Sequence, residues 1–549
     1  MKALNLLFLL STVFIISCRD VLEQEQIQAS QEDVRTRAVV AGVDYYTYPS
    51  NAPTSRYYTA KINGNNYYVY PMPDPINNSY NDDPNSPCSS TRYKPDILSF
   101  GIANSSGATI EITTNVDISS FKVRPDRVTG TITTSTRLSN FTVKKLNSRT
   151  LRLTITGPQT LSVEVNNDLT KALLVFANPL ETNVPNIQTC KHYFAAGTIS
   201  NIGVNNVLSS GDIVYIAPGA IVKGTFITAK GASGVKILGR GILSGENVTR
   251  TSTNSAPHMI AFRNATDCSV EGITIVTSQN WVLPLFGCDR IRIEHVKIVS
   301  LTGYEDGIDV IGGFYITIKN CFIWTKDDCV AVKAGVNYNW TDFGNGIDGK
   351  MDTHTITVQN CVLWSGERGN ALQIGCELNA TTYENMFFEN IDIIHAQNKC
   401  GTDIAPLSID NNGNGTVKWI TYQNIYLEDV ERYFINIKTE KTRYSPTGSE
   451  YQYSSNHPYT GGIVHDIIYR NIYLTKRTSN NPIHSGISNY SIVNGNVIPA
   501  SIRGVTFENL QINKKKITTY DPNFNNINLE KFVLMLNNVN ASTHLIRFQ

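Results

Sequence analysis

Short apolar–polar alternations fill the chain from about residue 191 onward, and eight of them share one seven-residue pattern. Each copy has apolar residues before its third position and an apolar pair after it. The third residue is Asn in six copies, at Asn320, Asn360, Asn390, Asn424, Asn471 and Asn509, and Gly272 and His295 occupy it in the first two. Successive copies lie 23 to 47 residues apart. Since no helical segments separate them, the spacing predicts strands stacked as a parallel β-helix.

The repeated Asn predicts a tight turn at the same place in successive rungs of this helix. Asn tolerates left-handed backbone, and amides stacked about 4.8 Å apart can hydrogen-bond along the axis. Cys321 and Cys361 follow the Asn in successive copies, so we expect them to stack as well. A leucine-rich repeat, the alternative with helices, lacks its Leu pattern here. The longer gaps indicate loops inserted on one side, where solenoids commonly bind ligands.

Residues 43–190 alternate differently. Runs such as ATIEITT (108–114) and LRLTITG (151–157) are separated by turn residues at hairpin-like intervals. This pattern predicts an antiparallel β-sandwich. We therefore expect an all-β protein in which a sandwich at 43–190 is followed by a parallel β-helix at 191–549, the candidate catalytic domain.

The N-terminus has the pattern of an export signal. Lys2 precedes an apolar stretch, residues 4–16, that is too short for a comfortable membrane span. It ends in IISC (15–18), which resembles a bacterial lipobox and implies cleavage before Cys18 and lipidation of that residue. We expect a signal peptide at 1–17, a polar tether at 18–42 and a lipoprotein of the outer membrane or cell surface. The alternative is an ordinary secretory signal, which gives a secreted or periplasmic protein.

Composition narrows the possible partners. The 549 residues carry a net charge of +1, which argues against nucleic acid or an anionic membrane as a general partner. Without Cys18 nine cysteines remain, an odd number, so an obligate disulfide framework is not expected. The chain shows no His and Cys spacing typical of a metal site and no phosphate-binding Gly loop. We expect a monomer without metal or cofactor, whose only membrane contact is the lipid anchor.

Two acidic motifs lie one rung apart in the predicted helix. Asp306, in TGYEDGIDVIGG (302–313), precedes Asp327 and Asp328, in TKDDCVAVKAG (325–335), by 21 and 22 residues. The third positions of the neighbouring copies, Gly272, His295 and Asn320, lie 23 and 25 residues apart, so the three acids should gather on one face. Carboxyl groups held at different pKa values perform glycoside hydrolysis, one as acid and one as base. The alternatives are a cation site or solvated turn acids.

The adjacency of Asp327 and Asp328 conflicts with the expectation that all three acids lie on one face. In a regular strand Asp327 and Asp328 point to opposite sides, and Asp328 shares the side of Val330 and Val332. That geometry would turn Asp328 inward. Both acids can reach the same space only if the chain bends there.

These motifs resemble those of the polygalacturonase family. YEDGIDV is similar to its NTDGxD motif and TKDDCVAVKAG to its GDDCIAIKSG motif, within a resemblance that covers about residues 195–515. The resemblance implies a right-handed parallel β-helix and hydrolysis with inversion by three aspartates. Asp327 would be the general acid, and Asp306 and Asp328 would hold and activate the water.

Two departures bear on the substrate. Asn370 stands where the family has the His of its GHG motif, and Asn436 replaces the Arg of its RIK motif, although Lys438 remains. In pectin-cleaving members that Arg–Lys pair holds the uronate carboxylate. The segment 211–246 and the N-terminal sandwich resemble the dextranase/isopullulanase family of the same clan, which cleaves neutral α-glucans. We therefore expect a dextranase-like polysaccharide hydrolase.

Several further side chains are candidates for binding the glycan. They are Asp309, Lys333, Arg368, Asn370, Lys438, Trp281 and Tyr304. A polygalacturonase-like pectin hydrolase remains the closest alternative. A β-helix polysaccharide lyase and a non-catalytic carbohydrate-binding protein are the others.

Overall fold

The computed structural model contains almost only strands. It describes residues 39–549 apart from 75–91, 127–140, 249–256, 304, 335–351, 379, 398–403, 443–444, 446–458, 476–483, 491, 494–495, 498–500, 524, 527, 529, 538 and 540–545. The predicted signal peptide 1–17, Cys18, the tether up to residue 38 and Tyr304 lie outside the described residues. The helices among the described residues are two short 3₁₀ turns, η1 (Leu169–Lys171) and η2 (Ile187–Thr189). None of the described helices has the length and apolarity to cross a membrane.

Two sheets packed face to face form the N-terminal part, as the alternation predicts. One sheet has the strand order β1 (Val39–Val40), β2 (Val43–Asp44), β6 (Asp96–Ile102), β12 (Leu173–Pro179), β11 (Gln159–Val165) and β8 (Phe121–Arg124), with β5 (Tyr70–Pro71) also on β6. The other has the order β4 (Asn65–Tyr67), β3 (Tyr58–Ile62), β7 (Ala108–Thr114), β10 (Thr150–Ile155) and β9 (Phe141–Lys145). The pairings are antiparallel except that of β6 with β12. Alternate residues of β7 are buried in the core between the sheets.

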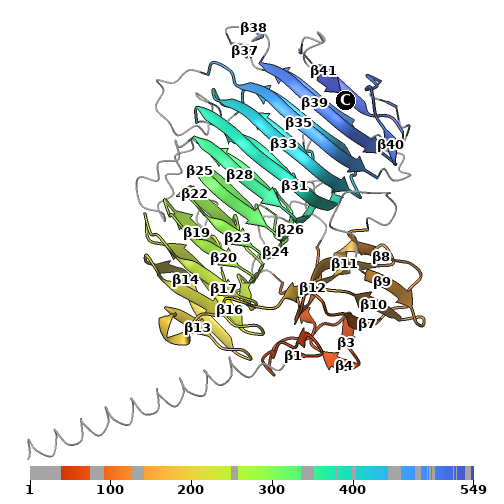
Figure 1. The fold of residues 1–549 in the computed structure, drawn as a ribbon, viewed down its shortest axis with the longest axis vertical. Coiled ribbons are helices and arrows are strands. Elements are labelled where there is room, and N and C mark those ends of the chain that lie inside the picture. Colours follow the sequence, from red (N-terminus) through yellow and green to blue (C-terminus); the bar gives the residue numbers. More distant parts are fainter. Residues whose placement is uncertain are drawn as a thin grey trace, which may run out of the picture.

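The remaining chain forms a parallel β-helix whose strands stack in three ladders (Figure 1). The first ladder contains β13 (His192–Phe194), β15 (Ile213–Ile216), β17 (Lys236–Gly239), β20 (Ser269–Glu271), β23 (Arg292–Glu294), β25 (Ile308–Lys319), β28 (Thr353–Gln359), β31 (Thr382–Ala396), β33 (Thr416–Leu427), β35 (Ile463–Leu474), β39 (Ile502–Ile512) and β42 (Ile546–Phe548). The second contains β14 (Ile199–Leu208), β16 (Ile221–Thr228), β18 (Ile242–Ser244), β21 (Thr274–Val276), β24 (Lys297–Ser300), β26 (Phe322–Thr325), β29 (Val362–Ser365) and the last residues of β31, β33, β35 and β39.

The third ladder carries the site described below. It contains the last residues of β14 and β16, then β19 (Ile260–Arg263), β22 (Leu283–Asp289), the start of β25, β27 (Val330–Ala334), β30 (Leu372–Leu378), β32 (Leu407–Asn411), β34 (Tyr433–Glu440), β36 (His484–Tyr490) and β41 (Val533–Asn537). Two hairpin pieces complete the chain, β37 (Ile492–Val493) with β38 (Asn496–Val497), and β40 (Lys515–Lys516) on β39. Inward-facing aliphatic and aromatic residues of all three ladders form one continuous core.

The repeated Asn residues occupy the predicted turns, between the first and second ladders. All six have φ between 53° and 56°, the left-handed region. Their amides bond along the axis: Asn390 donates to Asn360 at 2.6 Å and Asn509 to Asn471 at 2.8 Å. Cys321 and Cys361 stack in the core, one residue before the paired Phe322 and Val362. The cysteines among the described residues are free.

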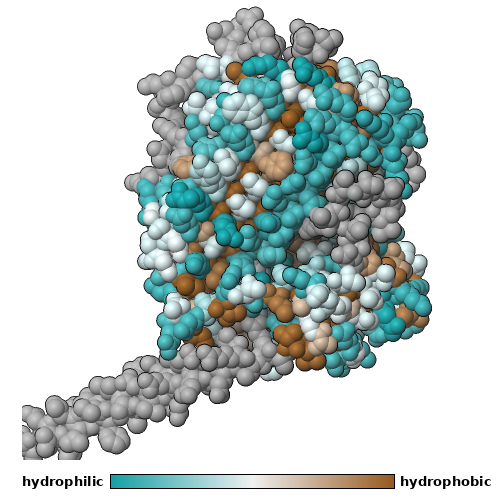
Figure 2. Space-filling model, viewed as in Figure 1, coloured by the Kyte–Doolittle hydropathy of each residue, from teal (hydrophilic) through white to brown (hydrophobic). Residues whose placement is uncertain are grey.

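The sandwich packs against the outer face of the second ladder over the rungs from β16 to β31 (Figure 1). Leu174 and Phe176 of β12 pack with Phe322, Trp324 and other apolar residues that point outward from this ladder. Outward-facing apolar residues would otherwise be exposed, so this packing explains why the ladder is apolar on both faces. The face of the first ladder is mostly hydrophilic over β28 to β39 (Figure 2).

Candidate active site

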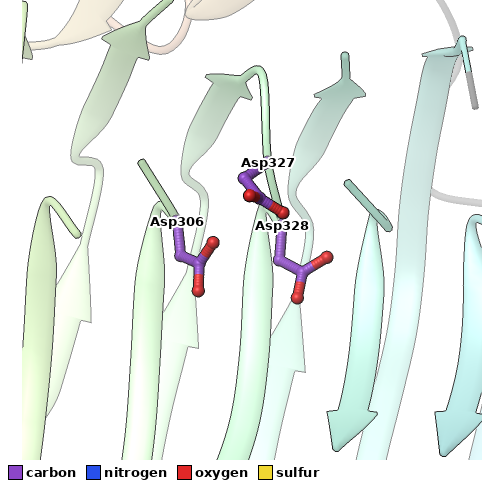
Figure 3. A group of neighbouring side chains, drawn as sticks. All are labelled: Asp306, Asp327 and Asp328. Carbon is purple, nitrogen blue, oxygen red and sulfur yellow. The ribbon is translucent and has the colours of Figure 1, made fainter. Parts of the chain in front are cut away.

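The three predicted acids gather where the second ladder passes into the third. Asp306 lies two residues before β25, and Asp327 and Asp328 lie between β26 and β27 on the next rung. Gly307 N–H donates to Asp328 O at 2.8 Å, which joins the two rungs. One carboxylate oxygen of each acid lies within 4.8 Å of those of the other two. Figure 3 shows the three side chains grouped at the starts of neighbouring strands.

A bend resolves the conflict over the two adjacent acids. Residues 326–329 are not in a strand, and the hydroxyl of Thr325 donates to the carbonyls of Asp327 and Asp328 at 3.0 and 3.1 Å. Gly369 of the next rung lies against this bend, and a Cβ there would be 1.9 Å from the carbonyl carbon of Asp327. The regular-strand geometry that would bury Asp328 in the core is therefore wrong.

Lys333 places one positive charge among these acids. Its Nζ lies 2.6 Å from Asp306 Oδ2, 3.0 Å from Asp309 Oδ1 and 3.6 Å from Glu377 Oε2. The ammonium also lies 3.9 Å from the centre of the Trp281 ring, a cation–π contact. Asp309 is fully buried, so its direct role is to hold Lys333. Trp281 and Lys333, both predicted to bind substrate, thus adjoin the three acids.

Asn370 holds Asp328 from the following rung. Its backbone N–H and its side-chain amide each donate to Asp328 Oδ1 at 2.7 Å, and its Oδ1 accepts from Ala405 N–H at 2.8 Å. The amide therefore has a fixed orientation. The contacts of this amide in the structure are with Asp328 and Ala405.

The surroundings of the two adjacent acids set their pKa values apart. Burial, together with the charges of Asp306 and Asp328, raises the pKa of Asp327 well above its usual range. Burial and Asp306 also raise the pKa of Asp328, but Lys333 and the two bonds from Asn370 oppose them and hold it at about 7. Asp327 is partly exposed whereas Asp328 is nearly buried. A carboxyl that favours its protonated form thus adjoins one that ionises at about pH 7, an arrangement suited to general acid–base chemistry.

The other two basic candidates lie farther along the ladder or at its edge. Lys438, in β34, has its Nζ 2.6 Å from Glu440 Oε1 and 3.3 Å from Asp410 Oδ2. Asn436 points outward two residues earlier in the same strand. Arg368 is partly exposed, and its backbone N–H donates to Lys326 O at 2.9 Å, beside the bend that carries the acids.

Sequence reasoning named Asp309 only as a candidate for binding the glycan, and it did not pair either lysine with its carboxylates. Asp410 lies directly beside Lys438 in the register of β32 and β34, and Asp309 lies 24 residues, about one rung, before Lys333. The rung spacing that brought Asp306 to Asp327 would have found both. Glu377 follows an irregularity between β27 and β30, so no fixed spacing in the sequence indicates it.

Three carboxylates at this spacing also suit a divalent cation. Lys333 already pairs with Asp306 at the same place, which lowers the attraction that the cluster has for a second cation. Acid–base chemistry needs only the three carboxyl groups themselves.

Residues 214–483 match the family model of glycosyl hydrolases family 28. A polygalacturonase of Fusarium fujikuroi is 25% identical over 256 residues, which cover 42% of this chain and 59% of that protein. Endopolygalacturonase I of Aspergillus aculeatus is also 25% identical, over 46% of this chain and 59% of the relative. The chain thus spans less than two thirds of the length of these relatives.

A solved structure supports the whole architecture. Dex49A from Penicillium minioluteum superposes with a TM-score of 0.60 over 93% of this chain and 99% of its own, at 14% sequence identity. The likeness therefore concerns the fold. It confirms the predicted all-β arrangement, in which a β-sandwich is followed by a parallel β-helix.

Proposed function

We propose that this protein is a glycoside hydrolase that cleaves a polysaccharide with its three clustered aspartates, because residues 214–483 match the family model of glycosyl hydrolases family 28. The observation that carries the proposal is the meeting of Asp306, Asp327 and Asp328 from two successive rungs within 4.8 Å. Their environments differ in the way that acid and base catalysts require.

In this mechanism Asp327 donates its proton to the glycosidic oxygen as the bond to the anomeric carbon breaks. Asp306 and Asp328 hold a water between them and take its proton as its oxygen attacks that carbon. A water that donates one hydrogen bond of about 2.7 Å to each carboxylate can bridge the gap between them. Lys333 stabilises the negative charge of Asp306, and Asn370 that of Asp328.

The attack is proposed to invert the anomeric configuration. Two carboxyl groups about 5 Å apart are typical of retaining enzymes, in which one of them attacks the sugar. A third acid changes this expectation, because one pair can carry the water while the remaining group supplies the proton. The anomer formed first, observed by proton NMR, decides the matter: an inverted product supports the water-holding pair, and a retained one excludes it.

We propose that the substrate is a neutral α-glucan of the dextran or pullulan type. A uronate carboxylate needs unpaired positive charge, and Lys438 is already engaged by Glu440 and Asp410. Asn436, in the position of the family's Arg, brings no charge. Repulsion from the two carboxyl groups would therefore disfavour an acidic sugar beside Lys438.

A pectin hydrolase is the second candidate. The names of both curated relatives, a polygalacturonase and an endopolygalacturonase, favour it. Arg368, at the edge of the acid cluster, is a cation that could meet a uronate.

A substrate panel tests the proposal. The full chain is incubated with dextran, pullulan and polygalacturonate, with and without chelator, and reducing ends and ultraviolet absorbance are measured. Reducing ends from dextran or pullulan, without an absorbing product and independent of chelator, support a neutral-glucan hydrolase. Reducing ends from polygalacturonate alone would transfer the assignment to the pectin candidate, and an absorbing unsaturated product would indicate a lyase.

A further inference from the structure

Two large aromatic side chains are exposed on one edge of the β-helix. Tyr315 and Trp419 are 54% and 48% exposed, although most large apolar residues of the helix are buried. Both lie at turns between the third and first ladders, where each described rung from β25 to β39 places one residue in left-handed backbone. The other residues in this row are Thr355, Asn385, Asp466 and Gly504.

The two rings have no evident role in stabilising the fold. Left-handed backbone is unfavourable for a bulky residue and easy for Asn, Asp or Gly, which serve the same turn on other rungs. An exposed ring also gains little from burial. The fold therefore tolerates a local cost at Tyr315 and Trp419 that a smaller residue would avoid. Departures of this kind are a common mark of functional positions.

Neighbouring side chains fix the orientation of both rings. The ring of His354 meets Tyr315 edge-on with centroids 5.7 Å apart. Lys418 Nζ lies 4.1 Å from the centre of the Trp419 ring, and an ion pair with Glu384 at 3.0 Å holds that lysine. The rings are thus presented to solvent in set positions, which lowers the entropy that a ligand must overcome.

The edge between the rings is polar and almost neutral. Thr355 and the exposed amide of Asn385 occupy the two intervening rungs, so the rings lie three rungs, or about 14 Å, apart along the axis. The charged side chains beside it have partners: Lys418 pairs with Glu384, and Asp466 Oδ2 lies 2.8 Å from His465 Nδ1. Aromatic platforms separated by hydroxyl and amide groups suit the apolar faces and hydroxyls of consecutive sugars, and they offer nothing to a charged polymer.

We propose that this edge, formed by Tyr315, Thr355, Asn385 and Trp419, is a second binding site for an uncharged polysaccharide. It rests on the proposed function in one respect, namely that the ligand is the polymer the enzyme cuts. The edge lies across the third ladder from the acids, since Asp306 and Tyr315 belong to the same rung and are joined by at most about 30 Å of extended chain. A polymer held there keeps other segments at high local concentration near the acids.

The test uses the full chain carrying Asp327→Asn, so that binding is measured without cleavage. Its migration in native gels containing dextran, pullulan or polygalacturonate is compared with that of the same chain also carrying Tyr315→Asn and Trp419→Asn. We expect the added pair to weaken retardation by a neutral glucan at least fivefold, and Asp466→Asn, in the same row, to leave it unchanged. Equal retardation with and without the pair, or retardation by no neutral glucan at all, would overturn the proposal.

Thermal melting separates binding from folding. Because Asn suits left-handed backbone, we expect the pair of Asn substitutions to leave the melting temperature equal or raise it. A lower melting temperature with unchanged retardation would assign the rings to stability and overturn the proposal. Loss of retardation would support it even if none of the three glycans is hydrolysed, so failure of the proposed function stays distinguishable.

Discussion

Adjacent carboxyl groups have unlike surroundings in this site. Burial and neighbouring acids raise the pKa of both Asp327 and Asp328, and Lys333 opposes this at both, whereas the two hydrogen bonds from Asn370 lower the pKa of Asp328. The role of each group therefore follows from its contacts. Asn370, which departs from the family's His, has a clear task here because it donates twice to one oxygen of Asp328.

Replacing Asn370 tests this division of roles. Asn370→Asp keeps the shape of the side chain but removes the amide donor and adds repulsion, so the pKa of Asp328 should rise above about 7. The acid must lose its proton to serve as base, and the acid limb of the kcat/KM–pH profile should move to higher pH. We expect a fall of about tenfold or more at pH 6. An acid limb at its original pH would contradict the contact's role.

At the scale of elements, the bend between β26 and β27 places the acids. Gly369 permits it, since any side chain there would meet the Asp327–Asp328 peptide. The element that supports the site is therefore the following rung. Its hydrogen bonds run from Arg368 and Asn370 to Lys326 and Asp328.

Gly369→Ala should displace the acids. A Cβ 1.9 Å from the Asp327 carbonyl carbon forces the bend to move, and shifts of about 1 Å in catalytic groups can cost about 10²-fold in rate. Gly486→Ala, in β36 of the same ladder, is the matched control because its added Cβ meets nothing closer than 3.5 Å. Initial rates on the preferred glycan, with circular dichroism to check folding, compare the two. Equal rates for both variants would refute the argument.

The Asn turns make a separate prediction about stability. Asn390→Ala loses the bond to Asn360 and adopts left-handed backbone at a cost of about 1–2 kcal/mol, whereas Asn390→Gly loses only the bond and some chain entropy. The urea midpoint should fall further for Ala than for Gly. The reverse order would show that the backbone conformation is not what the turn demands.

The apolar–polar alternation and the repeated Asn explain which parts of the fold and the site could be predicted from the sequence. Alternation and the Asn spacing specify rungs, and a rung count brings Asp306 to Asp327 and Asp328 because stacked residues recur at that interval. Side-chain direction within a bend depends on contacts such as those of Thr325 and Gly369, which no periodicity encodes. The pairing of Lys438 with Asp410 follows the register of successive rungs and could have been predicted in the same way.

At the scale of the whole molecule, a buried charge network joins the two domains. His395 of β31 contacts Glu164 of the sandwich and Asp429 of the helix, both at 2.7 Å. Arg124 of β8 lies 2.6 Å from Glu428. Burial lowers the pKa of His395, but the charge of Glu164 and bonds to Asp429 and Glu164 outweigh it and raise the pKa overall. The charged imidazole thus supports the docking of the sandwich.

The pH dependence of stability should reflect this network. A raised pKa in the folded state means that the contribution of His395 is fully present below its unfolded value, about 6.5, and is lost as pH rises through the folded value. His395→Gln should therefore lower stability by about 3–5 kcal/mol at pH 6 and by less at pH 9. Urea midpoints of the unsubstituted chain and of His395→Gln at pH 6 and pH 9 measure this difference in stability. An equal difference at the two pH values would contradict a charged His395.

One substitution decides whether Asp327 is the proton donor of a polysaccharide hydrolase. Asp327→Asn keeps the size of the side chain and removes the proton, while Asp117→Asn on the sandwich surface serves as control. Reducing ends released from dextran, pullulan and polygalacturonate are measured for the unsubstituted chain and both variants. We expect Asp327→Asn to lose about 10²-fold or more of the rate on the cleaved glycan and the control to keep it. An unchanged rate in Asp327→Asn would show that Asp327 is not the proton donor.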